Sequence, residues 1–343
     1  MLGIANKAVK VERSTSASLA GKRVVVVGGT NGLGRAVALQ AAQDGAAVTV
    51  VGRTFLDEGV KGISFVKADL SLMTTAARVA RALPAESIDV LFMTIGIVPD
   101  GKRIATTEGI EIDMAVSALS RLVILLHVAK RLPASARVFV MGFPGSKGAL
   151  IKSTIDDVNS TKAYSFYSAH MNTVALNEVL VLSWAKKLNI YGLNPGLIKT
   201  GIRKPVHGGG CLGGFLEWCI GLFNISPAVY AAGIVPLFTA TGFASGTMFD
   251  QLGKPILPSP ELSNDPALVQ RWMTECTSLV PAAALSEANG SNAEVMRSDG
   301  SMVTVGRVTH GRFAEGACIG GNISLMRTGI DIQNPEDWHH FPC

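Results

Sequence analysis

Hydrophobic positions along this chain form short apolar runs, separated by longer stretches in which polar and apolar residues mix. Continuous apolar runs of this length are typical of strands that are buried on both faces of a parallel sheet. Because strand-like and helix-like segments alternate, the pattern predicts right-handed βαβ units and a doubly wound α/β fold. The predicted strands are Val24–Val27, Val48–Val51, Ile63–Lys67, Val90–Met93, Val138–Met141 and Ile190–Leu193, and the predicted helices are Arg35–Asp44, Thr74–Leu83, Ile110–Leu132 and Tyr167–Lys187.

The alternation covers most of the 343 residues and fades towards the C-terminus, where glycines are frequent and aliphatic clusters are few. Hydrophobic residues make up 48% of the chain and charged residues 17%, which is enough for one large core. We therefore expect a flexible N-terminal segment at residues 1–20, a single domain at 21–283 and a poorly ordered C-terminal tail at 284–343.

The first predicted strand runs directly into a glycine-rich turn, Gly28–Gly34, and a predicted helix follows the turn. Glycines at this place let the backbone turn tightly and approach a pyrophosphate, which then lies at the N-terminus of the helix. This arrangement is typical of a Rossmann-type sheet that binds a dinucleotide. The predicted binding residues in the turn are Gly28, Thr30, Asn31, Gly32, Leu33 and Gly34.

The end of the second predicted strand indicates which dinucleotide is bound. Rossmann-type proteins that use NAD usually place an acidic residue there to hold the ribose 2′-hydroxyl. Here the strand ends in Gly52-Arg53-Thr54, and an arginine attracts a 2′-phosphate. We therefore expect NADP(H), with Arg53 at the phosphate. Arg35 is open to two interpretations, a phosphate contact or a surface salt bridge.

Charge and cysteine usage exclude some other classes of function. The net charge of +5 is scattered, without a Lys/Arg-rich run, so we expect no nucleic-acid partner. The five cysteines show no CxxC pair and no histidine at ligand spacing, so we expect no metal site and reduced thiols in the cytoplasm. The first 20 residues are rich in serine and lysine, which makes a mitochondrial presequence the minor alternative.

One stretch, Trp218–Phe249, carries no charged residue and raises the question of a membrane span. Pro227 and Pro236 interrupt it, and Ser226 followed by Pro227 is typical of a helix start. We interpret this region as an apolar substrate lid, Cys211–Phe223, followed by a core helix. We expect no membrane span, although the stretch would also suit peripheral contact with a membrane.

Taken in order, these motifs resemble those of the short-chain dehydrogenase/reductase family, in particular its retinol-dehydrogenase-like branch, over Gly21–Pro281. The glycine spacing in Gly28–Gly34 is the spacing found in the family. The resemblance implies further cofactor contacts at the ends of later strands, with adenine after the third strand and with nicotinamide after the sixth. The residues at the family's motif positions are Asp69 and Leu70 after the third strand, Gly96 after the fourth, and Pro195, Gly196 and Thr200 after the sixth.

The resemblance also implies where the chemistry takes place. In the family a tyrosine gives or takes the proton, and a lysine four residues later lowers the pKa of that tyrosine. A serine orients the substrate oxygen, and an asparagine holds a relay water. Tyr167 matches the tyrosine and Ser117 stands at the asparagine position. Met171 and Gly142 stand at the lysine and serine positions, so the catalytic tetrad is atypical.

Two basic side chains are candidates to replace the missing lysine. His170 follows Tyr167 by three residues, so both lie on one side of a helix. Lys199 follows the Pro-Gly loop and could reach the cofactor. A second frame uses Tyr164 as the proton donor, with Ser168 at the lysine position, and it does not restore the lysine either.

Three functions follow from these alternatives. The first is an NADP(H)-dependent oxidoreductase that acts on a carbonyl or hydroxyl group of a lipophilic small molecule, which the apolar lid would suit. The second is a redox-neutral lyase, isomerase or cyclase on the same fold. The third is a pseudoenzyme that binds NADP and acts as a sensor or scaffold. The apolar helix Ile110–Leu132 would allow a homodimer, and interior packing explains the same pattern.

Overall fold

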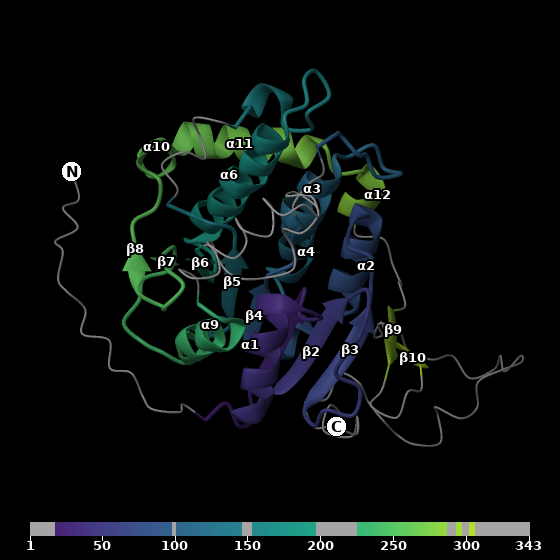
Figure 1. Cartoon of the computed structure of the whole chain (residues 1–343), viewed down its shortest axis with the longest axis vertical. Coiled ribbons are helices and arrows are strands. Elements are labelled where there is room, and N and C mark those ends of the chain that lie inside the picture. The colour runs from purple at the N-terminus through teal and green to yellow at the C-terminus, as the bar shows by residue number, and fades with distance from the viewer. Residues whose placement is uncertain are drawn as a thin grey trace, which may run out of the picture.

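The computed structural model describes residues 18–97, 101–145, 153–196, 225–286, 293–296 and 302–305. The predicted lid Cys211–Phe223, the candidates Lys199 and Thr200, and most of the two predicted terminal segments lie outside these residues. The described residues form a sheet that is covered by helices on both faces (Figure 1). This arrangement confirms the predicted Rossmann-type doubly wound α/β fold.

The described strands form one ten-stranded sheet in the order β10-β9-β3-β2-β1-β4-β5-β6-β7-β8. The central part from β3 to β7 is parallel, and β8, β9 and β10 join its two edges antiparallel. All six predicted strands form, each within one residue of its predicted ends. The strands are β1 (Arg23–Val27), β2 (Ala47–Gly52), β3 (Ile63–Lys67), β4 (Val90–Met93), β5 (Arg137–Met141), β6 (Asn189–Leu193), β7 (Met248–Phe249), β8 (Pro255–Ile256), β9 (Ala293–Met296) and β10 (Met302–Val305).

Helices α1 and α9 pack on each other over one face of the sheet, and α2, α4 and α6 cover the other (Figure 1). On this second face α11 packs on α6, and α12 packs on α2 and α4. The α-helices are α1 (Gly32–Gln43), α2 (Met73–Ala82), α3 (Ile112–Met114), α4 (Ser120–Val128), α6 (Phe166–Trp184), α9 (Pro227–Ile234), α10 (Pro260–Ser263), α11 (Pro266–Ser278) and α12 (Ala282–Leu285). Short 3-10 turns are η1 (Ala85–Ser87), η3 (Ile155–Asp157) and η5 (Val235–Phe238), and η2 (Ala115–Leu119) is a π-helical turn.

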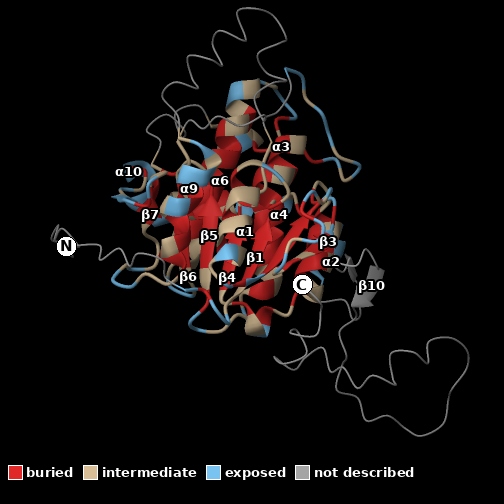
Figure 2. Cartoon of the chain, turned by 60° about the horizontal axis from the view of Figure 1, so that its bottom comes forward, coloured by how far each residue is buried: buried red, intermediate tan, exposed pale blue. Residues whose placement is uncertain are grey.

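Each face of the sheet has its own apolar core, and Figure 2 shows the central strands, β1 to β6, almost wholly buried between the two helical layers. On the face covered by α1 and α9, the rings of Phe92, Phe139 and Phe238 pack with centroids 5.3 to 6.2 Å apart. On the other face, the residues of α4 from Leu122 to Leu125 are fully buried. The two cores hold the carboxyl ends of the strands in fixed positions.

The predicted helix Ile110–Leu132 forms as three consecutive pieces, α3, the π turn η2 and α4. Its apolar side chains pack against α2, α6 and α12 of the same chain. This packing accounts for the apolar pattern, so the pattern no longer supports a homodimer through this helix. The π turn η2 interrupts the α-helical geometry, and π turns often occur at functional sites.

The uncharged stretch contains the helix start that its sequence predicts. The Ser226 side chain accepts a hydrogen bond of 3.3 Å from the backbone N–H of Val229, and Pro227 occupies the first turn of α9. Among the described residues, no helix is both long enough and apolar enough to cross a membrane.

Two short strands follow residue 283. Ala293–Met296 forms β9 beside β3, and Met302–Val305 forms β10 beside β9. The sequence does not predict either strand, because each is short and neither lies within a longer apolar run. The rest of this segment beyond Ser286 lies outside the described residues.

Candidate functional site

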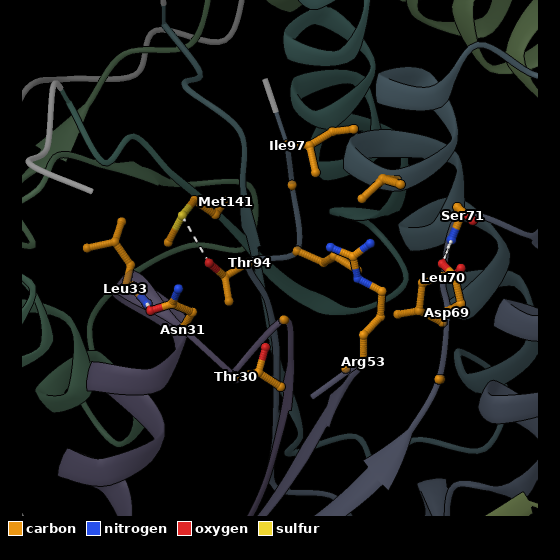
Figure 3. A pocket seen from close by; sticks show the side chains of 18 of the residues that line it. Thr30, Asn31, Leu33, Arg53, Asp69, Leu70, Ser71, Thr94, Ile97 and Met141 are labelled. Atoms are coloured by element: carbon orange, nitrogen blue, oxygen red, sulfur yellow. Dashed lines mark hydrogen bonds between the residues drawn. The ribbon is translucent and has the colours of Figure 1, made fainter. Parts of the chain in front are cut away.

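A cavity of about 810 Å³ opens at the carboxyl ends of the parallel strands, where the order of the sheet reverses between β1 and β4 (Figure 3). Open α/β sheets bind their ligands at this kind of position. Every predicted cofactor residue that the structure describes lines the cavity. These residues are Gly28, Thr30, Asn31, Gly32, Leu33, Gly34, Arg53, Asp69, Leu70, Gly96, Pro195 and Gly196.

Three glycines of the turn, Gly28, Gly29 and Gly34, have no space for a side chain. Gly28 has a φ of 90°, and a Cβ atom added to it would lie 2.5 Å from the Cα atom of Ile95. A Cβ atom on Gly34 would collide with the carbonyl oxygen of Gly28. Asn31 caps helix α1 by accepting a hydrogen bond of 2.8 Å from the N–H of Gly32. The helix therefore starts at the cavity wall, with backbone close to any ligand in the turn.

The two arginines near this turn have different surroundings. Arg35 binds Asp57, with its Nε atom 2.9 Å from both carboxylate oxygens, and this hydrogen bonding raises the pKa of Arg35. The structure therefore favours the salt-bridge interpretation of Arg35. Arg53 lies at the end of β2, is exposed and reaches into the cavity, and no ion pair to it is found in the described part of the chain (Figure 3).

Asp69 follows β3 at the same end of the cavity (Figure 3). One of its carboxylate oxygens accepts a hydrogen bond of 3.0 Å from the N–H of Ser71. Its carboxylate does not cap α2, because Glu108 accepts the N–H groups of Met73 and Thr74 at 2.6 and 3.1 Å. A helix cap that lies more than thirty residues away in sequence could not be predicted from local patterns.

A buried polar network lies behind the opposite end of the cavity. Asp113 is fully buried, and one of its oxygens is 2.8 Å from Nδ1 of His170. The Ser117 hydroxyl donates to the other oxygen and accepts a hydrogen bond of 2.9 Å from the N–H of Ile97, which lines the cavity. The sequence candidates Ser117 and His170 therefore meet at one carboxylate, which sequence reasoning missed.

Arg121 extends this network beneath the ends of β4 and β5. Its guanidinium donates to the carbonyl oxygens of Ile95 and Met141, and to the side-chain oxygen of Asn177 at 2.7 Å. Burial lowers the pKa of Arg121 to about 9, and the nearby charge of Asp113 acts against that shift. The guanidinium therefore stays charged at neutral pH.

The sequence does contain a signal for the network. Asp113, Ser117 and Arg121 recur at intervals of four residues inside a helix that is otherwise apolar. Polar side chains at this spacing lie on one side of a helix. Their burial on an apolar helix indicates a function or an internal partner rather than a solvated face.

The comparisons with known proteins agree with this geometry. No protein-family model matches the chain. An uncharacterized oxidoreductase of Saccharomyces cerevisiae is 43% identical over 282 residues, which cover 77% of this chain and 90% of that protein. Human retinol dehydrogenase 12 is 26% identical over 207 residues, which cover 54% of this chain and 64% of that enzyme. The crystal structure of a dehydrogenase/reductase from Sinorhizobium meliloti 1021 superposes with a TM-score of 0.50 and 20% identity, over 68% of this chain and 95% of that one.

The chain belongs to the short-chain dehydrogenase/reductase family. Met171, which the resemblance aligns with the family's lysine, is buried and packs against Val174 and Phe143. Tyr167 stands in the first turn of α6 with 48% of its surface exposed, and no described group hydrogen bonds to its hydroxyl. Tyr164 precedes α6, so Ser168 is not one turn from it on a common helix.

Proposed function

We propose that this protein is an NADP(H)-dependent oxidoreductase that acts on a carbonyl or hydroxyl group of a lipophilic small molecule. The observation that carries the proposal is the cavity, which joins the glycine turn, Arg53 and the ends of β4 to β6 in one space. At Gly28 and Gly34 the turn has no space for a side chain. A backbone without side chains can approach a bound pyrophosphate closely.

The residues around the cavity fit the parts of NADP(H) from one end to the other. The turn and the start of α1 would hold the pyrophosphate, and Arg53 would bind the 2′-phosphate by parallel charge-assisted hydrogen bonds. The remaining contacts follow the family: Asp69 and Leu70 at adenine, and Gly96, Pro195, Gly196 and Thr200 around the nicotinamide half. When bound, the cofactor supplies or accepts a hydride.

The chain itself supplies the proton. We propose Tyr167 as the proton donor to the carbonyl oxygen, supported by Ser117 and by His170 or Lys199 in place of the lysine. Tyr167 and His170 stand one turn apart on α6, and Ser117 reaches His170 through Asp113. A general acid of this kind accelerates reactions by about 100- to 10,000-fold.

A lipophilic substrate is favoured by the walls at this end of the cavity. Four apolar side chains line it where the nicotinamide half would lie. They are Ile97, Ile112, Val116 and Met141. Apolar walls with a few polar groups are typical of sites that bind small lipophilic ligands.

The test compares the two arginines by calorimetric titration with NADPH and NADH. Arg53→Ala removes the 2′-phosphate contact, so NADPH affinity should fall by about 10- to 100-fold while NADH affinity changes little. Arg35→Ala is the matched control, because Arg35 is bound to Asp57. Equal losses for both cofactors in Arg53→Ala, or an equal effect of Arg35→Ala, would contradict the proposal.

A second candidate function rests on the apolar lysine position. Met171, packed against Val174 and Phe143, cannot assist a proton transfer by its charge, which would suit a redox-neutral enzyme or a pseudoenzyme on the same fold. Tight NADPH binding without reduction of any carbonyl in a broad aldehyde and ketone screen would favour this candidate.

A further inference from the structure

Asp113 restricts the state of the His170 ring. The carboxylate is fully buried, and its two oxygens face the Ser117 hydroxyl and the His170 Nδ1 atom. An ionised carboxylate only accepts hydrogen bonds, so both neighbours must donate to it. The neutral His170 ring therefore carries its proton on Nδ1, and Nε2 keeps a free lone pair.

The position of the ring allows the Nε2 lone pair to take part in proton transfer. Nε2 lies on the side of the imidazole away from Asp113, and the His170 side chain is 32% exposed. Tyr167 stands one turn earlier on the same side of α6 and is itself half exposed. His170 therefore contacts the buried Asp113 carboxylate and lies one helical turn from the exposed Tyr167, which the proposed function assigns as the proton donor.

We propose that Asp113 is the positioning residue of a proton relay in which Nε2 of His170 exchanges its proton with the Tyr167 phenol. This inference rests on the proposed function and adds the residue that orients the relay. It also explains how the Tyr167 phenol regains its proton without a lysine at residue 171.

The relay balances one proton for each carbonyl reduced. The phenol O–H bond breaks as the carbonyl oxygen takes the proton, and the hydride that the carbonyl carbon takes would come from NADPH, which would be oxidised to NADP⁺. Solvent then protonates the Nε2 lone pair of the neutral ring, and the Asp113 carboxylate offsets the positive charge of the imidazolium that forms. The Nε2–H bond breaks as this proton passes to the phenolate, which restores the phenol and the neutral ring. Oxidation of an alcohol follows the same steps in reverse.

His127 provides an internal reference for the ring state. Its Nε2 atom is 2.7 Å from the carbonyl oxygen of Ala284, which can only accept a hydrogen bond. The structure therefore requires opposite neutral tautomers in the two rings, Nε2–H at His127 and Nδ1–H at His170. The two histidines can be compared in one sample.

The experiment is a long-range ¹H–¹⁵N spectrum of the full-length protein, labelled at histidine and free of cofactor, at about pH 8, where most histidines are neutral. His170→Gln and His127→Gln assign the two rings. We expect Nδ1–H at His170 in the wild type and a shift towards Nε2–H in Asp113→Asn, with His127 unchanged. The proposal is overturned if His170 carries its proton on Nε2 in the wild type. It is also overturned if His170 has the same tautomer in the wild type and in Asp113→Asn.

Turnover provides the second readout, and it separates this proposal from the proposed function. Asp113→Asn should lower kcat for a carbonyl substrate by about 100-fold with little change in KM for NADPH, and His127→Gln should change neither. An Asp113→Asn protein with full kcat overturns the relay and leaves the oxidoreductase intact. A wild type that binds no NADPH overturns the proposed function, while the ring state is still read from the protein alone.

Discussion

A Cβ atom added to Gly142 would lie 2.5 Å from the Cβ atom of Asn177, closer than two such carbons approach in folded proteins. Asn177 is held at this place because its amide nitrogen donates to the carbonyl oxygens of Ser117 and Thr173, at 2.9 and 2.8 Å, and its oxygen accepts from Arg121. The helix α6 therefore occupies the space that a serine at residue 142 would need. The lack of space at Gly142 and the buried polar network are two aspects of one packing arrangement.

A side chain at residue 142 should therefore destabilise the protein. We predict that Gly142→Ala and Gly142→Ser each lower the free energy of unfolding by about 1–3 kcal/mol, because the side chain overpacks a rigid junction. The measurement is chemical denaturation followed by circular dichroism. Gly101→Ala is the control, since a Cβ atom there meets nothing within 4 Å. A Gly142→Ser protein as stable as the wild type would show that α6 can move away from β5.

Removal of the Tyr167 hydroxyl tests the assignment of the proton donor. Tyr167→Phe should lower kcat by about 100-fold or more, because the phenol is the proposed acid. The affinity for NADPH should stay within about threefold, since Tyr167 does not line the cofactor cavity. Tyr164→Phe serves as the control from the alternative frame. Full activity of Tyr167→Phe, or a larger loss in Tyr164→Phe, would assign the acid elsewhere.

The C-terminal helices should contribute strongly to stability. Trp272 of α11 is 1% exposed and belongs to the core on the face covered by α6. Trp272→Ala should lower the free energy of unfolding by about 3–5 kcal/mol, through lost burial and the cavity that remains. Val229→Ala, at a half-exposed position, should change it by less than about 0.5 kcal/mol. A small effect of Trp272→Ala would mean that α11 is not docked in solution.

The thiol of Cys276 should be protected from alkylation. It is fully buried in α11, and burial raises the pKa of this thiol to about 12. At about pH 8 only about one molecule in 10,000 would then carry the reactive thiolate. Iodoacetamide should therefore label the Cys276 peptide at least about 100-fold more slowly in the native protein than in the denatured one, as measured by mass spectrometry. Comparable labelling rates in the two states would contradict this prediction.

Much of the fold could be predicted from sequence, and for clear physical reasons. Buried parallel strands need continuous apolar runs, so Val24–Val27 and Ile63–Lys67 could be placed almost to the residue. The glycine turn could be predicted equally well, because Gly28 and Gly34 stand where no side chain fits. The strands β9 and β10 were missed, because short strands at the edge of a sheet lack such runs.

The site was predictable only where a motif carries it. The cofactor residues follow local patterns at strand ends, and the structure gathers them around one cavity. The four-residue spacing of Asp113 and Arg121 on an apolar helix marks these side chains as unusual, but it does not name their partners. Those partners, His170 and Asn177, lie on α6 and are remote in sequence. The ion pair of Arg35 with Asp57 likewise joins residues that no motif connects.

The proposed oxidoreductase function depends first on binding of NADP(H) in the cavity. The most direct test is titration of the purified wild-type protein with NADPH and with NADH, followed by the fluorescence of the nicotinamide. We predict saturable binding of NADPH, and we expect NADH to bind at least about tenfold more weakly, because it lacks the 2′-phosphate that Arg53 would contact. If neither dinucleotide binds, the cavity is not a cofactor site and the proposed oxidoreductase function is wrong.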